Sequence, residues 1–176
     1  MIFNKTELKD AYIIEPEKLE DKRGFFARTW DTKIFEENGL DPKIVQCNIS
    51  RSLKKGTLRG MHNQIEPYAE TKIIRCTQGK ICDVIIDLRE NSSTYKKWQA
   101  FELSAENHRM LYVPEGFAHG FQSLEDDTEI FYQVSQFYNP ESERGVRWND
   151  PVFNIKWPLE EKIISEKDES LADFKD

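Results

Sequence analysis

The stretch TKIIRCTQGKICDVIIDL, residues 71–88, decides the fold class that this chain predicts. In its second half Val84 and Ile86 share one parity while Asp83 lies on the other, which is the alternation of a half-buried β-strand. Gly79 stands between the two halves, where the turn of a hairpin is expected. The stretch therefore predicts two strands joined by a tight turn.

Short segments of the same kind continue from residue 44 to residue 138, at the spacing typical of β-barrels and sandwiches. DTKIFEENG, residues 31–39, predicts a short helix with Asp31 as its N-cap and Gly39 at its end. We therefore expect a mainly β fold with a few short helices, in a single domain over residues 1–176. Further strands are expected over residues 97–103, 109–113, 120–124 and 129–138.

Composition disfavours several classes of partner. The chain carries a net charge of −7 and has no block of Lys and Arg, so neither nucleic-acid binding nor a basic membrane patch is expected. No apolar run approaches the length of a transmembrane helix, and the N-terminus lacks a signal-peptide pattern. Cys47, Cys76 and Cys82 lie in apolar runs, which indicates buried, reduced thiols in a cytoplasmic protein.

Three side chains on the expected strands could carry chemistry. Lys72 shares its parity with Ile74 and Cys76. A lysine that faces a core is rare unless it is paired or functional, although a lysine at a strand end also reaches solvent. His62, in LRGMHNQ, and Tyr132 are also expected to point inward. Each of these two fits either a catalytic group or an ordinary hydrogen-bonded core residue.

The other two histidines differ in their setting. His119 lies in PEGFAHGF, residues 114–121, where a loop position favours function, whereas His108 is expected on the surface. The chain continues from His62 with Asn63 and Gln64 and so lacks an HxH pattern, and no other His or Cys pair has ligand spacing, so no metal is expected. Motifs for dinucleotide binding, NTP hydrolysis and serine hydrolases are also lacking.

Eight blocks in order resemble the dTDP-4-dehydrorhamnose 3,5-epimerase family. They are DKRGFFART (21–29), VQCNIS (45–50), GTLRGMHNQ (56–64), KIIRCTQGKICDVIIDLR (72–89), LSAENHRM (103–110), PEGFAHGF (114–121), FYQVSQFY (131–138) and RWNDP (147–151). With the SEKD tail, the match runs over about residues 21–168. The resemblance implies a cupin-like jelly-roll barrel, a homodimer, and no metal or organic cofactor.

The resemblance also implies catalytic roles. His62 matches the general base that takes a proton from a sugar carbon beside the 4-keto group, and Asp168, in SEKD, matches the carboxylate that orients it. Tyr132 matches the proton donor on the opposite face of the ring. Lys72 matches the cation beside the developing enolate oxygen. The SEKD segment is therefore expected to fold back on the barrel, with only the residues beyond it loose.

Other matched positions imply contacts with the substrate. Arg23 and Arg59 match arginines that hold the diphosphate, and Tyr138 matches an aromatic that stacks on the base. The remaining matched contacts are Gln46, Asn48, His119, Glu143 and Lys167. The chain departs from the family at Arg28, where a Glu that contacts the nucleotide of a neighbouring subunit is common, and at Asn63, where an aromatic often follows the histidine. The Arg28 departure is expected to alter recognition of the nucleotide.

The implied function is a cofactor-independent epimerase that inverts C3, C5 or both in a nucleoside-diphosphate 4-keto-6-deoxy sugar, within a pathway for cell-surface polysaccharide. The nucleotide stays open between dTDP, GDP and CDP, and the sugar between a hexose and a heptose. Alternatives are epimerisation at C3 only or C5 only, 3,4-ketoisomerisation, a non-catalytic sugar-nucleotide binding barrel and a metal-dependent oxygenase.

Overall fold

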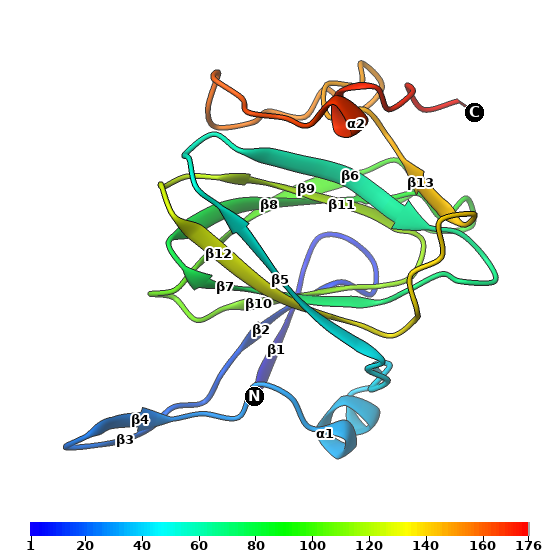
Figure 1. Cartoon of the computed structure of the whole chain (residues 1–176). Helices are drawn as coiled ribbons and strands as arrows, with labels where there is room; N and C mark the ends of the chain where they lie inside the picture. The colour runs from blue at the N-terminus through cyan, green and yellow to red at the C-terminus, as the bar shows by residue number, and fades with distance from the viewer. Residues whose placement is uncertain (176) are drawn as a thin grey trace.

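Two antiparallel sheets face each other and form the walls of a barrel (Figure 1). The computed structural model describes residues 1–175. A third sheet is a two-stranded hairpin that projects away from the barrel, and two short helices complete the fold. The prediction of a mainly β jelly-roll barrel with a few short helices is confirmed. Within the described residues no helix is long and apolar enough to cross a membrane.

The strands of each sheet run in the following order. The six-stranded sheet contains β1 (Ile2–Lys5), β2 (Tyr12–Glu15), β10 (Met110–Val113), β7 (Lys72–Gln78), β12 (Thr128–Val134) and β5 (Gln46–Ser52). The five-stranded sheet contains β13 (Glu143–Gly145), β6 (Leu58–Gln64), β11 (Phe117–Ser123), β8 (Lys80–Asp87) and β9 (Trp98–Ser104). The hairpin pairs β3 (Leu19–Asp21) with β4 (Gly24–Phe26), and the helices are α1 (Thr32–Glu37) and α2 (Glu166–Glu169).

The main core lies between the two sheets. The hairpin of β7 and β8 places one strand in each sheet, turning at Gly79, whose φ of +73° suits glycine. Ile74 and Cys76 of β7 therefore meet Ile81 and Ile85 of β8 inside the barrel. This packing confirms the inward parity expected for the 72–76 segment. The other buried members of this core are Leu8, Ala11, Leu103, Leu111, Val113, Phe117, Phe121 and Ile130.

β8 is buried on both faces, so the prediction of a half-buried strand was wrong. Val84 and Ile86 point away from the barrel interior into a second apolar cluster. This cluster also contains Val146 and Phe153, from the chain that follows β13. In Figure 1 this late segment, in orange and red, runs across the outside of β6. Asp83 lies on the other, inner face, with the same parity as Ile81 and Ile85, and it is fully buried inside the barrel.

The outer face of the six-stranded sheet is covered only in part. α1 begins after Asp31, whose side chain accepts a hydrogen bond from the Ile34 N–H, so the predicted helix and its N-cap are confirmed. Phe35 of this helix is buried against the sheet in a third apolar cluster. β5, at the sheet edge, is left uncovered, and Cys47 on it is exposed. The expectation that all three cysteines are buried was therefore wrong.

The C-terminal segment returns to the barrel, as expected for SEKD. α2 is capped by Ser165, and Asp168 on it is buried. The described residues beyond α2, 170–175, are also held, contrary to the expectation that they are loose. Arg147 N–H donates to the carbonyl oxygen of Ala172 at 3.1 Å, and Phe174 packs into the second cluster.

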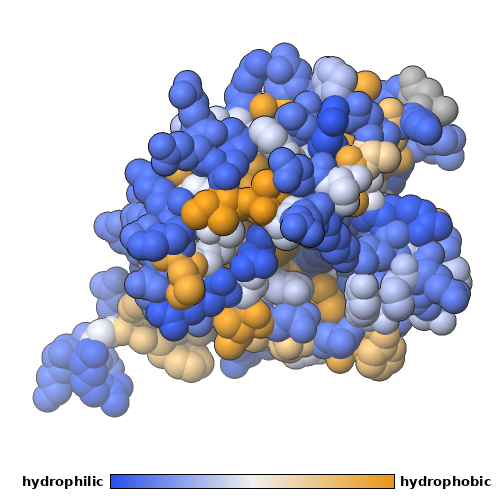
Figure 2. All heavy atoms as spheres, turned by 45° about the horizontal axis from the view of Figure 1, so that its top comes forward, coloured by the Kyte–Doolittle hydropathy of each residue, from blue (hydrophilic) through white to orange (hydrophobic). Residues whose placement is uncertain are grey.

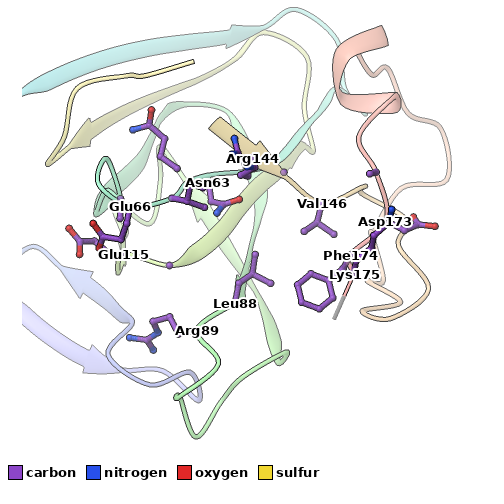
Figure 3. Close-up of a pocket in the computed structure, with 16 residues that line it drawn as sticks. Asn63, Glu66, Leu88, Arg89, Glu115, Arg144, Val146, Asp173, Phe174 and Lys175 are labelled. Carbon is purple, nitrogen blue, oxygen red and sulfur yellow. The ribbon is translucent and has the colours of Figure 1, made fainter. Parts of the chain in front are cut away.

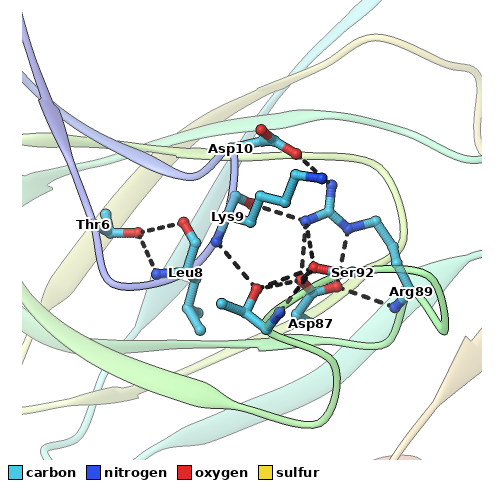
Figure 4. Close-up of polar contacts among 8 residues, drawn as sticks. Thr6, Leu8, Lys9, Asp10, Asp87, Arg89 and Ser92 are labelled. Carbon is cyan, nitrogen blue, oxygen red and sulfur yellow. Dashed lines mark hydrogen bonds and ion pairs between the residues drawn. The ribbon is translucent and has the colours of Figure 1, made fainter.

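A buried polar network closes one end of the barrel (Figure 4). The Asp87 carboxylate accepts hydrogen bonds from Arg89, Ser92 and Thr94, at distances from 2.5 to 3.1 Å. Arg89 also bonds to the Lys9 carbonyl oxygen and pairs with Asp10, which joins the loop between β1 and β2 to the end of β8. Burial alone would raise the pKa of Asp87, but the bonds from these donors outweigh it and hold the pKa below its ordinary value.

We expect Asp87→Ala to lower the free energy of unfolding at pH 7 by about 3 kcal/mol, because it breaks a buried ion pair whose arginine stays partly exposed. Since the folded pKa is lowered, the contribution of Asp87 is full above pH of about 4 and is lost as the pH falls through the folded value. Urea denaturation at several pH values measures both effects. Asp10→Asn, at the exposed end of the network, is the matched control and should cost less than about 1 kcal/mol. If Asp87→Ala and Asp10→Asn lowered the free energy of unfolding equally, Asp87 would not be the stabilising centre of the network.

Candidate active site

Two adjoining cavities open between the sheets, of about 320 and 390 Å³. They share His62, Lys72 and Tyr132 and so form one continuous site. His62 comes from β6 of the five-stranded sheet, whereas Lys72 and Tyr132 come from β7 and β12 of the six-stranded sheet. Side chains from opposite walls of the barrel therefore meet across a space large enough for a sugar.

A bulge in β6 brings Arg59 and His62 to the same cavity. His62 pairs with His119 of β11 and Arg59 pairs with Phe121, so three steps on β6 match two on β11. Strict alternation would instead send Arg59 and His62 to opposite faces. Gly60 within the bulge has a φ of +124°, and a Cβ there would lie 2.5 Å from the Cα of Gly120. The glycine of LRGMHNQ therefore permits the bulge that groups the arginine with the histidine.

Asp168 holds His62 from the C-terminal segment. The Asp168 Oδ1 lies 2.8 Å from Nε2 of His62, and Oδ2 accepts the Gly60 N–H at 3.1 Å. The Asp168 side chain is only 7% exposed. Burial alone would raise the pKa of Asp168, but the His62 contact and the Gly60 N–H outweigh it and keep the pKa below its ordinary value. A carboxylate in this position accepts the Nε2 hydrogen and leaves the lone pair on Nδ1.

Lys72 is largely buried and is paired inside the site. Its Nζ lies 3.2 Å from Oε1 of Glu70, and the two side chains are 12% and 11% exposed. Of the two interpretations that the sequence left open, a lysine that reaches solvent is thus excluded. Glu70 was missed because it precedes the strand in a stretch without a motif. Its position two residues before an inward lysine is the signal that could have found it.

His119 is paired with a buried carboxylate. It lies within β11 rather than on a loop, so the loop interpretation was wrong. Its Nε2 lies 3.0 Å from Oδ2 of Asp83 and 2.9 Å from Oδ1. Burial raises the pKa of Asp83, and the charges of His119 and Lys72 oppose this rise. Sequence reasoning placed Asp83 on a solvent face and therefore missed it as the partner of His119.

Tyr132 keeps its proton at neutral pH. Burial raises the pKa of its phenol above 10.0, and the nearby charge of Glu70 raises it further, while Arg59 acts in the opposite direction. The inward parity expected for Tyr132 is confirmed, because it packs against the main core. Its hydroxyl is therefore protonated, in a cavity whose opposite wall carries an imidazole.

Polar side chains from three elements meet at the mouth of the site. The Tyr138 hydroxyl donates to Oε2 of Glu143 at 2.8 Å, and Nζ of Lys167 lies 2.6 Å from Oε1 of the same carboxylate. Gln46 accepts the Tyr138 N–H at 2.8 Å. Asn48 lines the same cavity. These five residues thus gather as the resemblance implies, around one opening.

Arg23 and Arg28 do not reach the site of their own chain. Arg23 follows β3 in the projecting hairpin, is 83% exposed and pairs with Asp21. Arg28 pairs with Asp31, the N-cap of α1, at 2.6 Å. The hairpin, which we call the arm (residues 19–26), extends from the lower left of the barrel in Figure 1 and from the same corner in the tilted view of Figure 2.

Asn63 lines both the larger cavity of the site and a groove on the other side of β6. His108 lies in a turn outside the site, where its ring packs against Phe25 of the arm. Among residues 1–175, no group of three or more His, Cys, Asp or Glu side chains is arranged to hold a metal ion.

Comparison with known proteins identifies the family of this chain. The family model described as dTDP-4-dehydrorhamnose 3,5-epimerase matches residues 5–176. A dTDP-4-dehydrorhamnose 3,5-epimerase from Shigella flexneri is 46% identical over 173 residues, which cover 98% of this chain and 95% of that protein. The crystal structure of dTDP-4-dehydrorhamnose 3,5-epimerase from Elizabethkingia anophelis has a TM-score of 0.96 and 47% identity, covering 99% of this chain and 96% of that chain.

A further solved structure carries a ligand. It is a dTDP-6-deoxy-D-glucose-3,5-epimerase from Legionella pneumophila in complex with dTDP-4-keto-L-rhamnose. Its TM-score is 0.91 at 37% identity, and the match covers 98% of this chain and 92% of that chain.

We expect Tyr132 to ionise above pH 10, which a titration of tyrosinate absorbance can measure as the difference between the wild type and Tyr132→Phe. In a Glu70→Gln background the transition should move to lower pH, because a negative charge that opposes ionisation is removed. The same difference measured in denaturant, where the transition should lie near pH of about 10, is the control. A folded-state transition at or below the denatured one would contradict the expectation.

Proposed function

The chain belongs to the dTDP-4-dehydrorhamnose 3,5-epimerase family and is a nucleotide-sugar epimerase, and we propose that His62 and Tyr132 are its general base and its proton donor. Its substrate is a dTDP-linked 4-keto-6-deoxy sugar. The observation that carries the proposal is the placement of these two groups on opposite walls of one cavity.

Cations at the site suit an anionic diphosphate. Arg59 and Lys167 line the same cavity as His62, and both act on an anion that enters between the sheets. Arg59 donates to the Arg51 carbonyl oxygen, and it forms no ion pair with any of residues 1–175. Its guanidinium is therefore available to a phosphate. Tyr138 at the mouth offers an aromatic face to the base.

We assign removal of the substrate proton to His62. Its Nε2 hydrogen is held by Asp168, so Nδ1 carries the lone pair that accepts the proton from the carbon beside the 4-keto group. The imidazolium that forms is stabilised by the same carboxylate, which stays ionised because its pKa is lowered. The C–H bonding electrons move into the new C=C bond, and the carbonyl becomes an enolate.

The enolate oxygen needs a cation that is already in place. Lys72 reaches the cavity from the wall that also carries Tyr132, and Glu70 fixes its position without exposing it to water. His119 lines the cavity as well, held by Asp83. We assign the enolate charge to Lys72 and a neighbouring contact with the sugar to His119. A preorganised charge of this kind lowers the barrier most where charge develops.

The configuration of the sugar carbon is inverted because the base and the proton donor lie on opposite walls of the cavity. His62 removes the proton on one face of the sugar, and the Tyr132 hydroxyl delivers a proton to the same carbon on the other face. The phenolate regains a proton from solvent, and the imidazolium releases one to solvent, so the balance is restored without an external reagent. Repetition at the second carbon beside the keto group gives the 3,5-epimerisation.

Arg23 and Arg28 support a homodimer. Both lie on or beside the arm, far from the cavity of their own chain, and the arm exposes Leu19, Phe25 and Phe26 to solvent. An exposed apolar hairpin with cations suits insertion beside a second copy. We propose that the arm places Arg23 and Arg28 at the partner's site. Arg28 then adds a positive charge near the nucleotide.

We place the enzyme in the cytoplasm as one domain over its whole length, acting in carbohydrate biosynthesis on a small-molecule substrate. Cys47, Cys76 and Cys82 are all free thiols, which suits a reducing compartment. The net charge of −7 argues against nucleic acid or an anionic membrane as a partner.

We expect His62→Asn to lower deuterium incorporation at C3 and C5 by at least about 10²-fold, since it removes the base. Proton NMR in D₂O with the dTDP-linked 4-keto-6-deoxy sugar measures each position separately. Tyr132→Phe should slow formation of the inverted product more than it slows deuterium incorporation, because His62 can still remove and return a proton on its own face. Cys47→Ser, on the exposed side of β5, is the control and should keep the wild-type rate. Full exchange in His62→Asn would refute the assignment of the base.

The dimer role of the arm predicts subunit complementation. We expect Arg23→Ala and His62→Asn to be impaired alone, and a refolded equal mixture to regain about a quarter of the wild-type rate. This fraction arises because half of the dimers are mixed and one of the two sites in each is intact. A mixture no more active than the separate variants would show that the arm serves its own chain.

A further inference from the structure

The segment that carries Asp168 and Lys167 is attached to the barrel on both sides of α2. Before α2, Ile163 forms an isolated bridge with Thr57. Its carbonyl oxygen accepts the Leu58 N–H at 2.8 Å, and its N–H donates to Gly56 at 3.0 Å. This attachment fixes the entry to α2 at the start of β6. With this attachment alone, only the side chains of Asp168 and Lys167 would hold the helix against the barrel.

The second attachment comes after α2 and uses the RWNDP motif, to which none of the catalytic roles above is assigned. Arg147 N–H donates to the Ala172 carbonyl oxygen, and its guanidinium lies 2.7 Å from a carboxylate oxygen of Asp173. Asp150 is fully buried, and its Oδ2 accepts the Phe174 N–H at 2.5 Å. Together with residues 172–174, Arg147 and Asp150 form what we call the tail clasp.

Apolar contacts follow the same path. The Phe174 ring packs edge-on against Phe153, with centroids 5.4 Å apart. Leu171 lies directly on β13, since a Cβ on Gly145 would approach its methyl groups to 2.9 Å. The tail therefore rests on the same strand that pairs with the His62 end of β6.

One side of the tail faces open space rather than protein. A groove of about 830 Å³ runs along it, on the side of β6 away from His62 (Figure 3). Phe174 and Val146 border one end of this groove, and Glu66 and Glu115 border the other. Lys96 Nζ lies over the Phe174 ring, 5.5 Å from its centroid, and the clasp supplies the hydrogen bonds and the ion pair that hold the tail.

We propose that Arg147 and Asp150 are positioning residues, which set the Asp168 carboxylate against His62 by holding the tail on β13. Asp168 lies between the two attachments, six residues before Phe174. Loss of the clasp frees α2 to swing about Ile163 and lengthens the contact between Asp168 and Nε2 of His62, which is 2.8 Å. A displacement of about 1 Å at a catalytic group can cost about 10²-fold in rate.

The inference rests on the proposed function, because it acts through the His62 and Asp168 pair. We expect Asp150→Asn and Arg147→Met each to lower the exchange rate at saturating substrate about tenfold in the wild type. The amide of Asn has one acceptor oxygen and cannot serve the Val152 and Phe174 N–H groups together, as Asp150 does. In an Asp168→Asn background the same variants should change the rate less than about twofold, because the group that they position is already lost.

Two further variants separate positioning from general stability. Thr94→Val, in the remote Asp87 network, should lower the melting temperature while keeping the exchange rate at temperatures where it stays folded. Arg147→Lys keeps a cation for Asp173 and should recover part of the rate lost in Arg147→Met. Equal losses of exchange rate in the wild-type and Asp168→Asn backgrounds, or no loss in the wild type, would overturn the positioning role of Arg147 and Asp150. Neither result would contradict the proposed function. A wild-type rate in Asp168→Asn itself would instead overturn the proposed pair and this inference with it.

Discussion

The double burial of the five-stranded sheet is the constraint on which the rest of the structure depends. Its inner face packs against the six-stranded sheet, and its outer face is covered by the chain after β13. Burying apolar area on both faces stabilises the sheet at roughly 25 cal/mol per Å² and requires that a long C-terminal segment lie across β6. The active site uses this requirement, because the covering segment is the one that delivers Lys167 and Asp168 to His62.

The same constraint explains where buried charge occurs. A sheet without a solvent face must satisfy every polar side chain internally. Asp83, in the middle of β8, meets His119, and Asp87, at the end of the strand, meets Arg89; both carboxylates lie on the inner side. One pair lines the cavity and the other closes the barrel against the loop between β1 and β2. The Asp87 pair that stabilises the fold and the Asp83 contact at the active site thus have one physical origin, which is that β8 has no solvent-exposed face.

Much of the fold was predictable because its signals are local. The turn at Gly79, the N-cap at Asp31 and the inward parity of Lys72 each depend on residues within a few positions of one another. Burial of the outer face of β8 depends on chain sixty or more residues away, and no pattern within the strand reveals it. Sequence reasoning took this apolar outer face for the core face, and it therefore placed Asp83, which points into the barrel, on a solvent face. The grouping of Arg59 with His62 was hidden for another reason, since a bulge breaks the alternation from which orientation is read. The resemblance supplied that pairing, and parity alone would have rejected it.

An acidic protein can bind an anionic substrate at this site because the carboxylates in the site are paired with basic side chains. Most of the other carboxylates lie away from the site. In the cavity Asp83, Glu70 and Asp168 each contact a basic side chain, at 2.8 to 3.2 Å. Arg59 is the exception on the positive side, because it has no carboxylate partner within residues 1–175. Charges on the outer surface act on the site through solvent and are screened over about 10 Å at moderate salt. Within the two cavities the cations Arg59, Lys72 and Lys167 balance the carboxylates Glu70, Glu143 and Asp168, so the site does not share the net charge of −7. Glu143 holds Lys167 at this mouth, so a diphosphate that enters competes with a carboxylate already in place. Such competition favours a ligand that offers more than one anionic group at once, which a nucleoside diphosphate does and a free sugar does not.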